Sequence, residues 1–509
     1  MSQANLVIKN TFYLYVKMGL AMVIGLYSTR LILAALGAVD YGIFNLVGGV
    51  IGMLTFLNAS MTVSSQRYFS VTLGANDIKK SKQLYQLSTY LHLIIGIIIV
   101  IALEIFGLYI FDGFLNIPAD RINTAKLVYQ FMIISTFFTI NAVPFDAVIN
   151  AHENMLFDSV LGIIETLLKL AIAFLITFYG EDKLLLYVIL YTSLTVLVRI
   201  VKSFYCVRNY EECKIDFRSK VDKPLLREML SFASFNLVGS LAGIGRNQGL
   251  SLILNIFFGT VINAAYGIAN QVAGQLSSFS SMMLKAVNPQ LMKSEGANDR
   301  NRMLKIAMIS SKLSFFLLGI FAIPFIFEMN SILNLWLKNV PENSVIFCQL
   351  VLIANLTNLL TIGMASALQA TGKIKQYQTV VGLVLLLNLP LAYVLLYYGL
   401  PAYFAIASYI IIEFIACLLR LGFIKKIAGL SIKEYLNRVI FCLVGPVFLG
   451  ILASYIITNS VEINYRFLLT VPLCSFVMIV SMIWLGLYKE EKEIVNKLSM
   501  TIKSKIGFK

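Results

Sequence analysis

Charged residues are scarce in this chain: Asp, Glu, Lys and Arg make up 13% of its 509 residues, whereas hydrophobic residues make up 59%. So little polar surface cannot cover a soluble globule of this size, which excludes the soluble globular classes. Apolar stretches of helical length instead recur from end to end, and helices satisfy their own backbone hydrogen bonds within lipid. The sequence therefore predicts an all-α polytopic membrane protein.

Residues that serve metal and redox sites are also few, with six cysteines and two histidines. The cysteines form no C-x-x-C pair and have no metal-ligand spacing, so we expect them to be small apolar packing residues. His92 and His152 belong to no recognisable motif, and a helix end or a loop is the expected place for each. We therefore expect no metal ion, no bound cofactor and no catalytic residue.

Extramembrane sequence is lacking as well. There is no G-x-x-x-x-G-K-[ST] phosphate loop and no connecting segment long enough for a nucleotide-hydrolysing domain, which argues against a primary pump. All connecting loops are short, and none on the outer side offers the catalytic carboxylates expected of a glycan polymerase or glycosyltransferase. These absences favour a transporter over an enzyme.

Hydropathy predicts about fourteen transmembrane helices, each long enough to cross the bilayer. The first is too long for a signal-peptide core and is expected to remain as a span, without a cleaved leader. The predicted spans are 11–36, 41–70, 84–111, 123–149, 157–179, 184–207, 229–258, 263–291, 305–330, 344–371, 377–398, 402–424, 435–458 and 466–488.

The basic residues are distributed unequally between the two sides of this topology. If the amino terminus is cytoplasmic, the loops on that side carry about 25 Lys and Arg residues and the opposite loops about five. Both termini are therefore expected in the cytoplasm. We attribute the net charge of +15 to this asymmetry and to attraction for anionic lipid headgroups, not to binding of nucleic acid.

The chain looks internally duplicated. The tetrapeptide Gly-Ala-Asn-Asp occurs at 74–77 and again at 296–299, each time after a long apolar stretch. Two further matches share nearly the same displacement: Tyr41-Gly42-Ile43 with Tyr266-Gly267-Ile268, and Leu31-Ile32-Leu33 before Gly37 with Leu252-Ile253-Leu254 before Gly259. The copies lie six spans apart and so run in the same direction. They predict two lobes of six helices related by a pseudo-two-fold axis along the membrane normal.

The repeats divide the chain into segments. We predict an N-lobe of spans one to six at residues 1–207, a cytoplasmic linker at 208–228 and a C-lobe of spans seven to twelve at 229–426. Two further C-terminal helices, at 427–488, fall outside the repeat, and a basic cytoplasmic tail follows at 489–509. Two lobes around a shared axis can rock, which would open a central cavity first to one side of the membrane and then to the other.

Four cations inside the predicted spans are the candidate substrate-binding residues. Arg246 lies near the centre of span seven, where a cation costs about 2.5–3.5 kcal/mol or more unless it faces water or a partner. We expect it to line the central cavity, and the alternative is a buried ion pair that holds the lobes together. Lys17 and Arg30 lie on the counterpart span one and are expected to face inward. Lys285 on span eight either does the same or snorkels to the cytoplasmic headgroups.

Other basic residues within or near the ends of the spans are expected to reach the lipid headgroups. They are Arg67, Arg199, Lys202, Arg420 and Arg438. Lys312, near the cytoplasmic end of span nine, has the same two alternatives as Lys285.

Carboxylates within the spans are fewer than cations. Three of them, Glu165, Glu413 and Asp146, are candidates for uptake of a coupling ion, either H⁺ or Na⁺. The alternative for Glu165 is an intrahelical pair with Lys169, four residues further on. An excess of cations in a cavity implies an anionic cargo, because the planar fork of arginine suits phosphate oxygens and lysine adds a point charge.

The sequence resembles the polysaccharide and O-antigen flippases of the multidrug/oligosaccharidyl-lipid/polysaccharide (MOP) exporter superfamily. The resemblance rests on the fourteen spans, the six-plus-six duplication, the Leu36-Gly37…Tyr41-Gly42 turn, Gln66-Arg67-Tyr68 at the end of span two and the Leu73-Gly74 loop.

The resemblance implies a V-shaped, MATE-like transporter in the bacterial cytoplasmic (inner) membrane. Such a protein moves a polyprenyl-diphosphate-linked oligosaccharide to the outer leaflet by alternating access, for lipopolysaccharide O-antigen, capsule or exopolysaccharide. The resemblance also implies a cationic lumen for the diphosphate and glycan, and a lipid tail that stays outside or in a groove beside the last two helices. The implied partners are the lipid-linked oligosaccharide, membrane lipids and a polysaccharide polymerase with its chain-length machinery.

Two alternatives stay open. A multidrug or cation antiporter of the same superfamily would more naturally show twelve spans and an acidic cavity, which the basic excess disfavours. A membrane glycan polymerase is disfavoured by the absence of a large outer loop.

Overall fold

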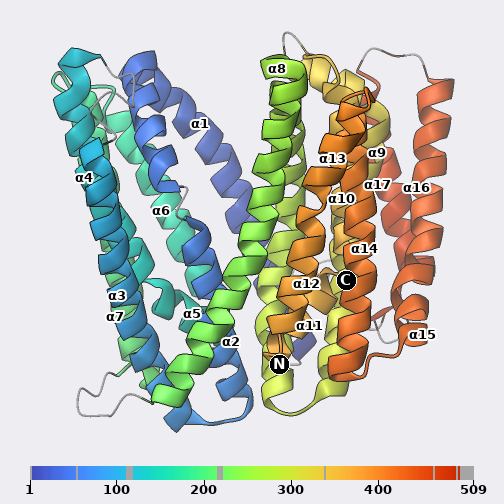
Figure 1. Ribbon diagram of the computed structural model, residues 1–509, viewed down its shortest axis with the longest axis horizontal. Helices are drawn as coiled ribbons and strands as arrows, with labels where there is room; N and C mark the ends of the chain where they lie inside the picture. Colours follow the sequence, from blue (N-terminus) through green and yellow to red (C-terminus); the bar gives the residue numbers. More distant parts are fainter. Residues whose placement is uncertain are drawn as a thin grey trace, which may run out of the picture. The chain divides into compact units, whose positions relative to one another are not determined.

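A computed structural model of the protein describes residues 3–52, 55–109, 118–214, 222–337, 340–461, 463, 465–488 and 491–492. Within these ranges every regular element is a helix, as the sequence predicts (Figure 1). The predicted basic tail lies outside the described residues apart from 491–492, as does the part of the predicted linker at 215–221.

The chain divides into two compact units, here called the N-unit and the C-unit. The N-unit comprises Asn10–Leu237, and the C-unit comprises Val238–Lys509 together with the residues before Asn10. The change of unit falls inside a helix, α8 (Lys223–Gly296), rather than in a loop.

The first turns of α8 belong to the N-unit because they pack against its second helix. The Tyr68 hydroxyl donates to Glu228 at 3.2 Å. The Arg67 guanidinium lies 4.7 Å from the ring centre of Tyr68 and 4.8 Å from that of Phe232. Arg67 is buried in this contact, so the expectation that it snorkels to headgroups is wrong.

The N-unit is a bundle around an apolar core that includes Val47, Val128 and Val188. α2 packs against α5, α4 packs against both α3 and α7, and α6 packs against α7. Its helices are most of α1 (Gln3–Gly52), then α2 (Thr55–Gly74), α3 (Ile78–Tyr109), α4 (Ile122–Asn141), α5 (Val143–Ala151), α6 (Met155–Leu175) and α7 (Lys183–Asn209), with short turns η2 (Ala119–Arg121) and η3 (Glu211–Cys213).

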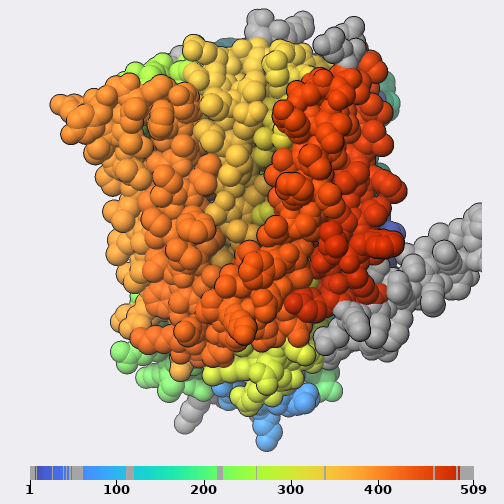
Figure 2. All heavy atoms as spheres, turned by 90° about the vertical axis from the view of Figure 1, so that its right-hand side faces the viewer, coloured from blue at the N-terminus to red at the C-terminus, as the bar shows by residue number. Residues whose placement is uncertain are grey.

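In the C-unit, α9 is central, since α10, α11, α16 and α17 all pack against it. Figure 2 shows one face of this unit, where the yellow segments are recessed between the orange α13 and α14 and the red α16 and α17, so that a groove runs along the face. After α8 its helices are α9 (Arg300–Trp336), α10 (Ser344–Leu359), α11 (Ile362–Thr371), α12 (Lys375–Leu386), α13 (Asn388–Tyr397), α14 (Tyr403–Ala428), α15 (Ile432–Tyr435), α16 (Phe441–Ser460) and α17 (Phe467–Ser481), with π-helical segments η4 (Leu436–Ile440) and η5 (Met482–Gly486).

The backbone repeats where the sequence repeats. α1 and α8 each contain one break in helical geometry, at Gly37 and at Gly259, and φ is +77° at both. With ψ near 180°, this region of backbone space is open essentially to glycine alone. The two glycines occupy matching positions of the sequence repeats, so the duplication predicted from sequence extends to the local conformation.

The repeated Gly-Ala-Asn-Asp tetrapeptide forms the same turn in both copies. Asn76 and Asn298 adopt left-handed backbone, with φ of 56° and 58°, which asparagine tolerates better than most residues. The amides of Asp77 and Asp299 donate back to the preceding helix at 3.0 and 2.9 Å, and each aspartate side chain caps the next helix by accepting from the backbone amide three residues on. The tetrapeptide therefore encodes a helix end followed by a helix start.

Among the described residues, nine helices are long and apolar enough to cross a membrane, or up to ten if the bent pair α10–α11 is one span. α6 is not among them, because its 21 residues include Asp158, Glu165 and Lys169. The helices follow the predicted order, but this measure does not confirm the predicted number of fourteen.

Two ion pairs attach the last helices to α9. Lys312 is fully buried, which excludes the snorkelling alternative, and its Nζ donates to the Gly486 carbonyl at 3.0 Å and to Glu491 at 2.5 Å. Toward the other end of α9, the buried Glu328 accepts from Arg466 at 2.7 Å. Because these pairs attach both ends of α17 to α9, and α16 also packs against α9, the helices outside the repeat are integral to the C-unit.

Candidate functional site

Arg246, on the first half of α8, is buried in an ion pair within the C-unit. Its Nη1 donates to Glu413 on α14 at 2.8 Å, and its Nη2 donates to the Tyr409 hydroxyl at 2.7 Å. The guanidinium also lies 4.0 Å from the centre of the Tyr409 ring, a cation–π contact. The pair joins two helices of one unit and does not join the two lobes to each other.

Glu413 is completely buried and is shared with a second arginine. Arg420, two turns further along α14, donates to it at 3.2 Å, and the Asn358 amide donates at 2.5 Å. Arg420 also donates to the Thr361 hydroxyl at 3.2 Å, at the bend between α10 and α11. We call Arg246, Glu413 and Arg420 the C-unit network.

The C-unit network carries a formal charge of +1. Removal of ions from water costs several kcal/mol each, and mutual attraction offsets this cost only when the remaining hydrogen-bonding groups are satisfied. Here the buried Nε atoms of Arg246 and Arg420 have no hydrogen-bond partner among the described residues. Among the described residues, Glu413 is the carboxylate that both guanidiniums share, so one positive charge is left over, which favours an anion over a cation near this network.

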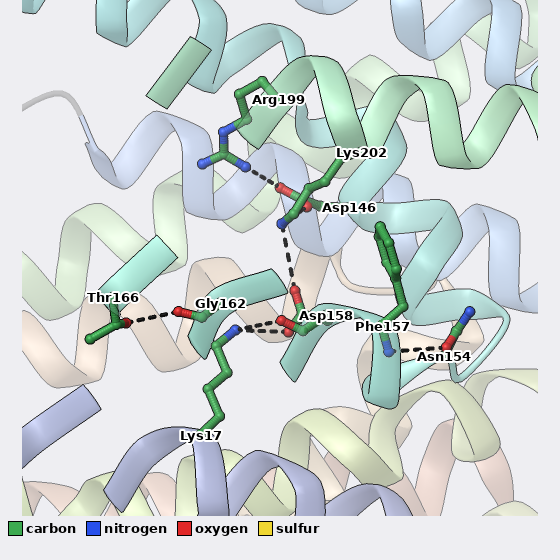
Figure 3. Close-up of polar contacts among 9 residues, drawn as sticks. All are labelled: Lys17, Asp146, Asn154, Phe157, Asp158, Gly162, Thr166, Arg199 and Lys202. Atoms are coloured by element: carbon green, nitrogen blue, oxygen red, sulfur yellow. Dashed lines mark hydrogen bonds and ion pairs between the residues drawn. The ribbon is translucent and has the colours of Figure 1, made fainter. Parts of the chain in front are cut away.

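A second charged network lies in the N-unit, as Figure 3 shows. Asp146 on α5 accepts from Arg199 at 3.0 Å and from Lys202 at 2.6 Å, both on α7. Lys202 also lies 3.5 Å from Asp158 on α6, and Asp158 accepts at 3.0 Å from Lys17 on α1. These five residues, the N-unit network, link four helices and again carry a formal charge of +1.

A glycine makes room for Lys17. A Cβ built on Gly162, one turn after Asp158 on α6, would lie 2.3 Å from the Cε of Lys17 and 2.7 Å from its Nζ. Any larger residue would therefore have to displace the lysine. The glycine allows the end of the Lys17 side chain to lie against α6 and reach the carboxylate (Figure 3).

The two networks share an architectural feature. Arg199 and Arg420 lie on α7 and α14, the last helices of the two repeats, and each contacts an interrupted span. Arg199 binds Asp146 just after the break between α4 and α5, and Arg420 binds Thr361 at the 44° bend between α10 and α11. Interrupted spans free backbone groups inside the membrane, and polar side chains collect there.

The structure separates the predicted pair on span one. Lys17 turns toward Asp158 within the N-unit, whereas Arg30 is exposed, on the side of α1 that also exposes Val23 and Tyr27. Thirteen residues of α-helix correspond to about 3.6 turns, which places the two side chains on different faces. The two residues therefore do not share a face of α1, and the expectation that both face inward stays a prediction. Lys285 is half-buried on the second half of α8.

The three candidate coupling carboxylates differ in their partners. The intrahelical pair between Glu165 and Lys169 is confirmed at 2.8 Å, with the Glu165 side chain 29% exposed. Glu413 and Asp146 each lie between two cations.

Sequence reasoning missed the binding partners of several cations. Arg199, Lys202 and Arg420 were expected to reach headgroups, but they are partly or wholly buried in the networks, and Asp158 was not among the predicted carboxylates. The spacing of Arg199 and Lys202, one turn apart on the same helix face, was the available signal, because two such cations inside a span require an acidic partner.

Comparison with known proteins gives the family and the fold. Residues 7–295 match the family described as polysaccharide biosynthesis protein. No curated protein matches the sequence.

Three similar solved structures have TM-scores near 0.7. A MATE protein in its straight conformation has a TM-score of 0.71 at 13% identity, over 84% of this chain and 97% of that chain. An outward-facing multidrug resistance MATE family transporter of the MOP superfamily has 0.71 at 13%, over 85% and 98%. A MOP superfamily transporter from Pyrococcus furiosus, described by the reverse polarity of its binding pocket, has 0.69 at 13%, over 84% and 98%. These structures are of transporters, not enzymes, and at such identities they establish the fold.

Proposed function

Because the chain belongs to the polysaccharide biosynthesis protein family and has the fold of MOP superfamily transporters, we propose that it is a flippase for a polyprenyl-diphosphate-linked oligosaccharide. The cargo would be the repeat unit of an O-antigen, a capsule or an exopolysaccharide. It would cross the bacterial cytoplasmic membrane from the inner to the outer leaflet by alternating access, with both termini of the protein in the cytoplasm and a polysaccharide polymerase as the downstream partner.

The observation that carries this proposal is the sign of the charge inside the helices. Each of the two networks has one more cation than carboxylates, and the C-unit network keeps two guanidinium Nε atoms without partners among the described residues. A diphosphate supplies negative charge and acceptor oxygens that suit arginine. A cationic drug, the cargo of the alternative antiporter, would meet repulsion from both networks.

The groove of the C-unit suits the remaining part of the cargo. It is flanked by α13 and α14 on one side and by α16 and α17 on the other (Figure 2). The exposed side chains of these helices are largely apolar, for example Phe414 and Phe448. A polyprenyl tail would stay in contact with lipid there while the polar head crosses.

The test is reconstitution of the protein in liposomes with a labelled polyprenyl-diphosphate oligosaccharide, followed by measurement of its movement between leaflets. We expect wild type to exchange the lipid and Arg246→Ala to lose exchange. Failure of the folded wild type to move the lipid, combined with drug-driven ion exchange, would overturn the proposal in favour of the antiporter.

A further inference from the structure

The second half of α8 carries a stripe of polar and small residues on one face. Their spacing places them within about one third of the helix circumference. Four are exposed and the other two, Ser278 and Lys285, are half-buried. This stripe consists of Gln271, Gly274, Gln275, Ser278, Ser281 and Lys285.

The hydrogen-bonding groups of the stripe are only partly used. The amides of Gln271 and Gln275 make no hydrogen bond with any described residue. The hydroxyls of Ser278 and Ser281 donate to carbonyls of their own helix at 3.0 and 3.1 Å, which leaves their oxygens as acceptors. Space is open beside the stripe, since a Cβ on Gly274 would meet no atom within 4 Å.

Three polar residues of the stripe are specific to the second repeat. With the displacement that matches Tyr41 to Tyr266, the residues of the first repeat that correspond to Gln271, Gln275 and Ser278 are Leu46, Val50 and Met53. The shared fold therefore does not require polar side chains at these positions. An amide exposed to lipid leaves its hydrogen-bonding groups unsatisfied, which costs free energy. We therefore expect the stripe to contact water or a polar ligand.

We propose that this stripe binds the sugar residues of the cargo, with Lys285 nearest the diphosphate. Amides and hydroxyl oxygens offer the mixed donors and acceptors that sugar hydroxyls require. From Gln271 to Lys285 the helix rises about 21 Å, a length that suits an oligosaccharide rather than a single sugar. Lys285 is nearest the predicted cytoplasmic end of the helix, the level at which the diphosphate of an inner-leaflet lipid lies. The inference rests on the proposed function and adds to it the surface that recognises the glycan.

The first measurement tests whether the stripe faces water. Gln271→Cys and Gln275→Cys are labelled in native membranes with a charged, membrane-impermeant maleimide. Phe476→Cys on α17, where the phenylalanine is 65% exposed, serves as the control that faces lipid. Background is low because five of the six native cysteines are buried. We expect labelling at 271 and 275 and none at 476. Absence of labelling at 271 and 275 would mean that lipid, the other unit or a second copy covers the stripe, and would overturn the proposal.

The second measurement tests for the glycan. At about ten times its Kd, the polyprenyl-diphosphate oligosaccharide should slow labelling at 271 and 275 about tenfold, whereas the polyprenyl diphosphate without sugar should not. Equal protection by both lipids, or protection by neither, would overturn the inference.

A transport measurement separates this inference from the proposed function. Gln271→Leu with Gln275→Leu should slow exchange of the oligosaccharide lipid at least about tenfold, and that of the lipid with a single sugar much less. An equal loss for both lipids would assign the stripe to movement of the lobes and overturn the inference. If wild type moves neither lipid but the glycan still protects 271 and 275, the site stands and the flippase proposal fails.

Discussion

The guanidinium of Arg246 and the carboxylate of Glu413 lie 2.8 Å apart with both side chains shielded from water, and the carboxylate has a second arginine, Arg420, at 3.2 Å. The two ends of the Arg246–Glu413 pair are therefore not equivalent. Loss of Arg246 leaves a neutral pair of Glu413 with Arg420, whereas loss of the Glu413 charge leaves two buried guanidiniums facing each other. Substitutions at the two positions should separate transport from stability.

We expect Arg246→Ala to reduce transport of the lipid-linked oligosaccharide at least about tenfold while the protein stays folded and abundant. Glu413→Gln should instead lower the free energy of unfolding by about 3–5 kcal/mol, because it leaves two buried guanidiniums without their carboxylate partner. Thermal unfolding in detergent and abundance in membranes measure the second effect. Arg246→Lys, which keeps the positive charge but lacks the planar guanidinium with its paired donors, is the matched control. Equal loss of abundance in Arg246→Ala and Glu413→Gln would assign Arg246 a purely structural role.

Gly162→Ala should destabilise the N-unit through Lys17. The new methyl group would overlap the lysine stem and move its Nζ away from Asp158. In a Lys17→Ala background the same substitution should be neutral or stabilising, as Gly→Ala is within an open helix, which gives a coupling of about 1 kcal/mol or more in a double-mutant cycle of thermal unfolding. Gly243→Ala, at a position with no atom within 4 Å, is the control. Additive effects of Gly162→Ala and Lys17→Ala would contradict this account.

Gly37→Ala and Gly259→Ala should each cost about 1–3 kcal/mol, because both positions have a backbone conformation that is essentially restricted to glycine. Gly25→Ala on α1 lies in ordinary helix with open space and should be neutral or stabilising. Melting temperatures of the three variants in detergent test the comparison. If Gly25→Ala were as costly as the other two, backbone strain would not be the cause.

Low pH should destabilise the N-unit at the end where Asp182 caps α7. Burial alone would raise the pKa of Asp182, but hydrogen bonds from Arg121, the Leu185 amide and Thr124 outweigh it and hold the pKa below its usual range. Such a carboxylate stabilises the fold above its unfolded pKa of about 3.9, and the contribution is lost as the pH falls through the lower folded pKa.

The corresponding measurement is the melting temperature between about pH 3 and pH 7. Asp182→Asn should lower it near neutral pH and have progressively less effect below about pH 4. Asp120→Asn, in the same region but exposed, should leave the profile unchanged. A difference between wild type and Asp182→Asn that is constant with pH would contradict the assignment.

Within the part of the chain that the structure describes, Glu165 has one cationic partner, Lys169, whereas Asp146 and Glu413 have two each. It is therefore the group best placed to bind and release an ion. We expect Glu165→Gln to remove any acceleration of transport by an imposed H⁺ or Na⁺ gradient while exchange without a gradient continues. Lys169→Gln is the companion variant, because it removes the cation paired with Glu165 and keeps the carboxylate. A gradient response of wild-type size in Glu165→Gln would exclude Glu165 as the coupling site.

Much of the fold follows from periodicity and repetition along the chain. Long apolar runs predict helices, and glycine or asparagine with a capping aspartate predicts where one helix ends and the next begins, because these signals act over a few residues. The Gly37 and Gly259 breaks and both Gly-Ala-Asn-Asp turns are of this kind. The boundary of the units was less predictable, since the first turns of α8 pack against Tyr68, more than 150 residues earlier in the chain.

By itself, the sequence determined that this is a helical, duplicated membrane protein and that cations outnumber carboxylates inside it, because hydropathy, repeats and charge are properties of residue order. Tertiary structure alone decided which cation meets which carboxylate. Asp158 reaches Lys17, and Glu413 reaches Arg246, across 141 and 167 residues. The packing of whole helices and the high free-energy cost of an unpaired charge away from water determine these partners. No local sequence pattern encodes either of them.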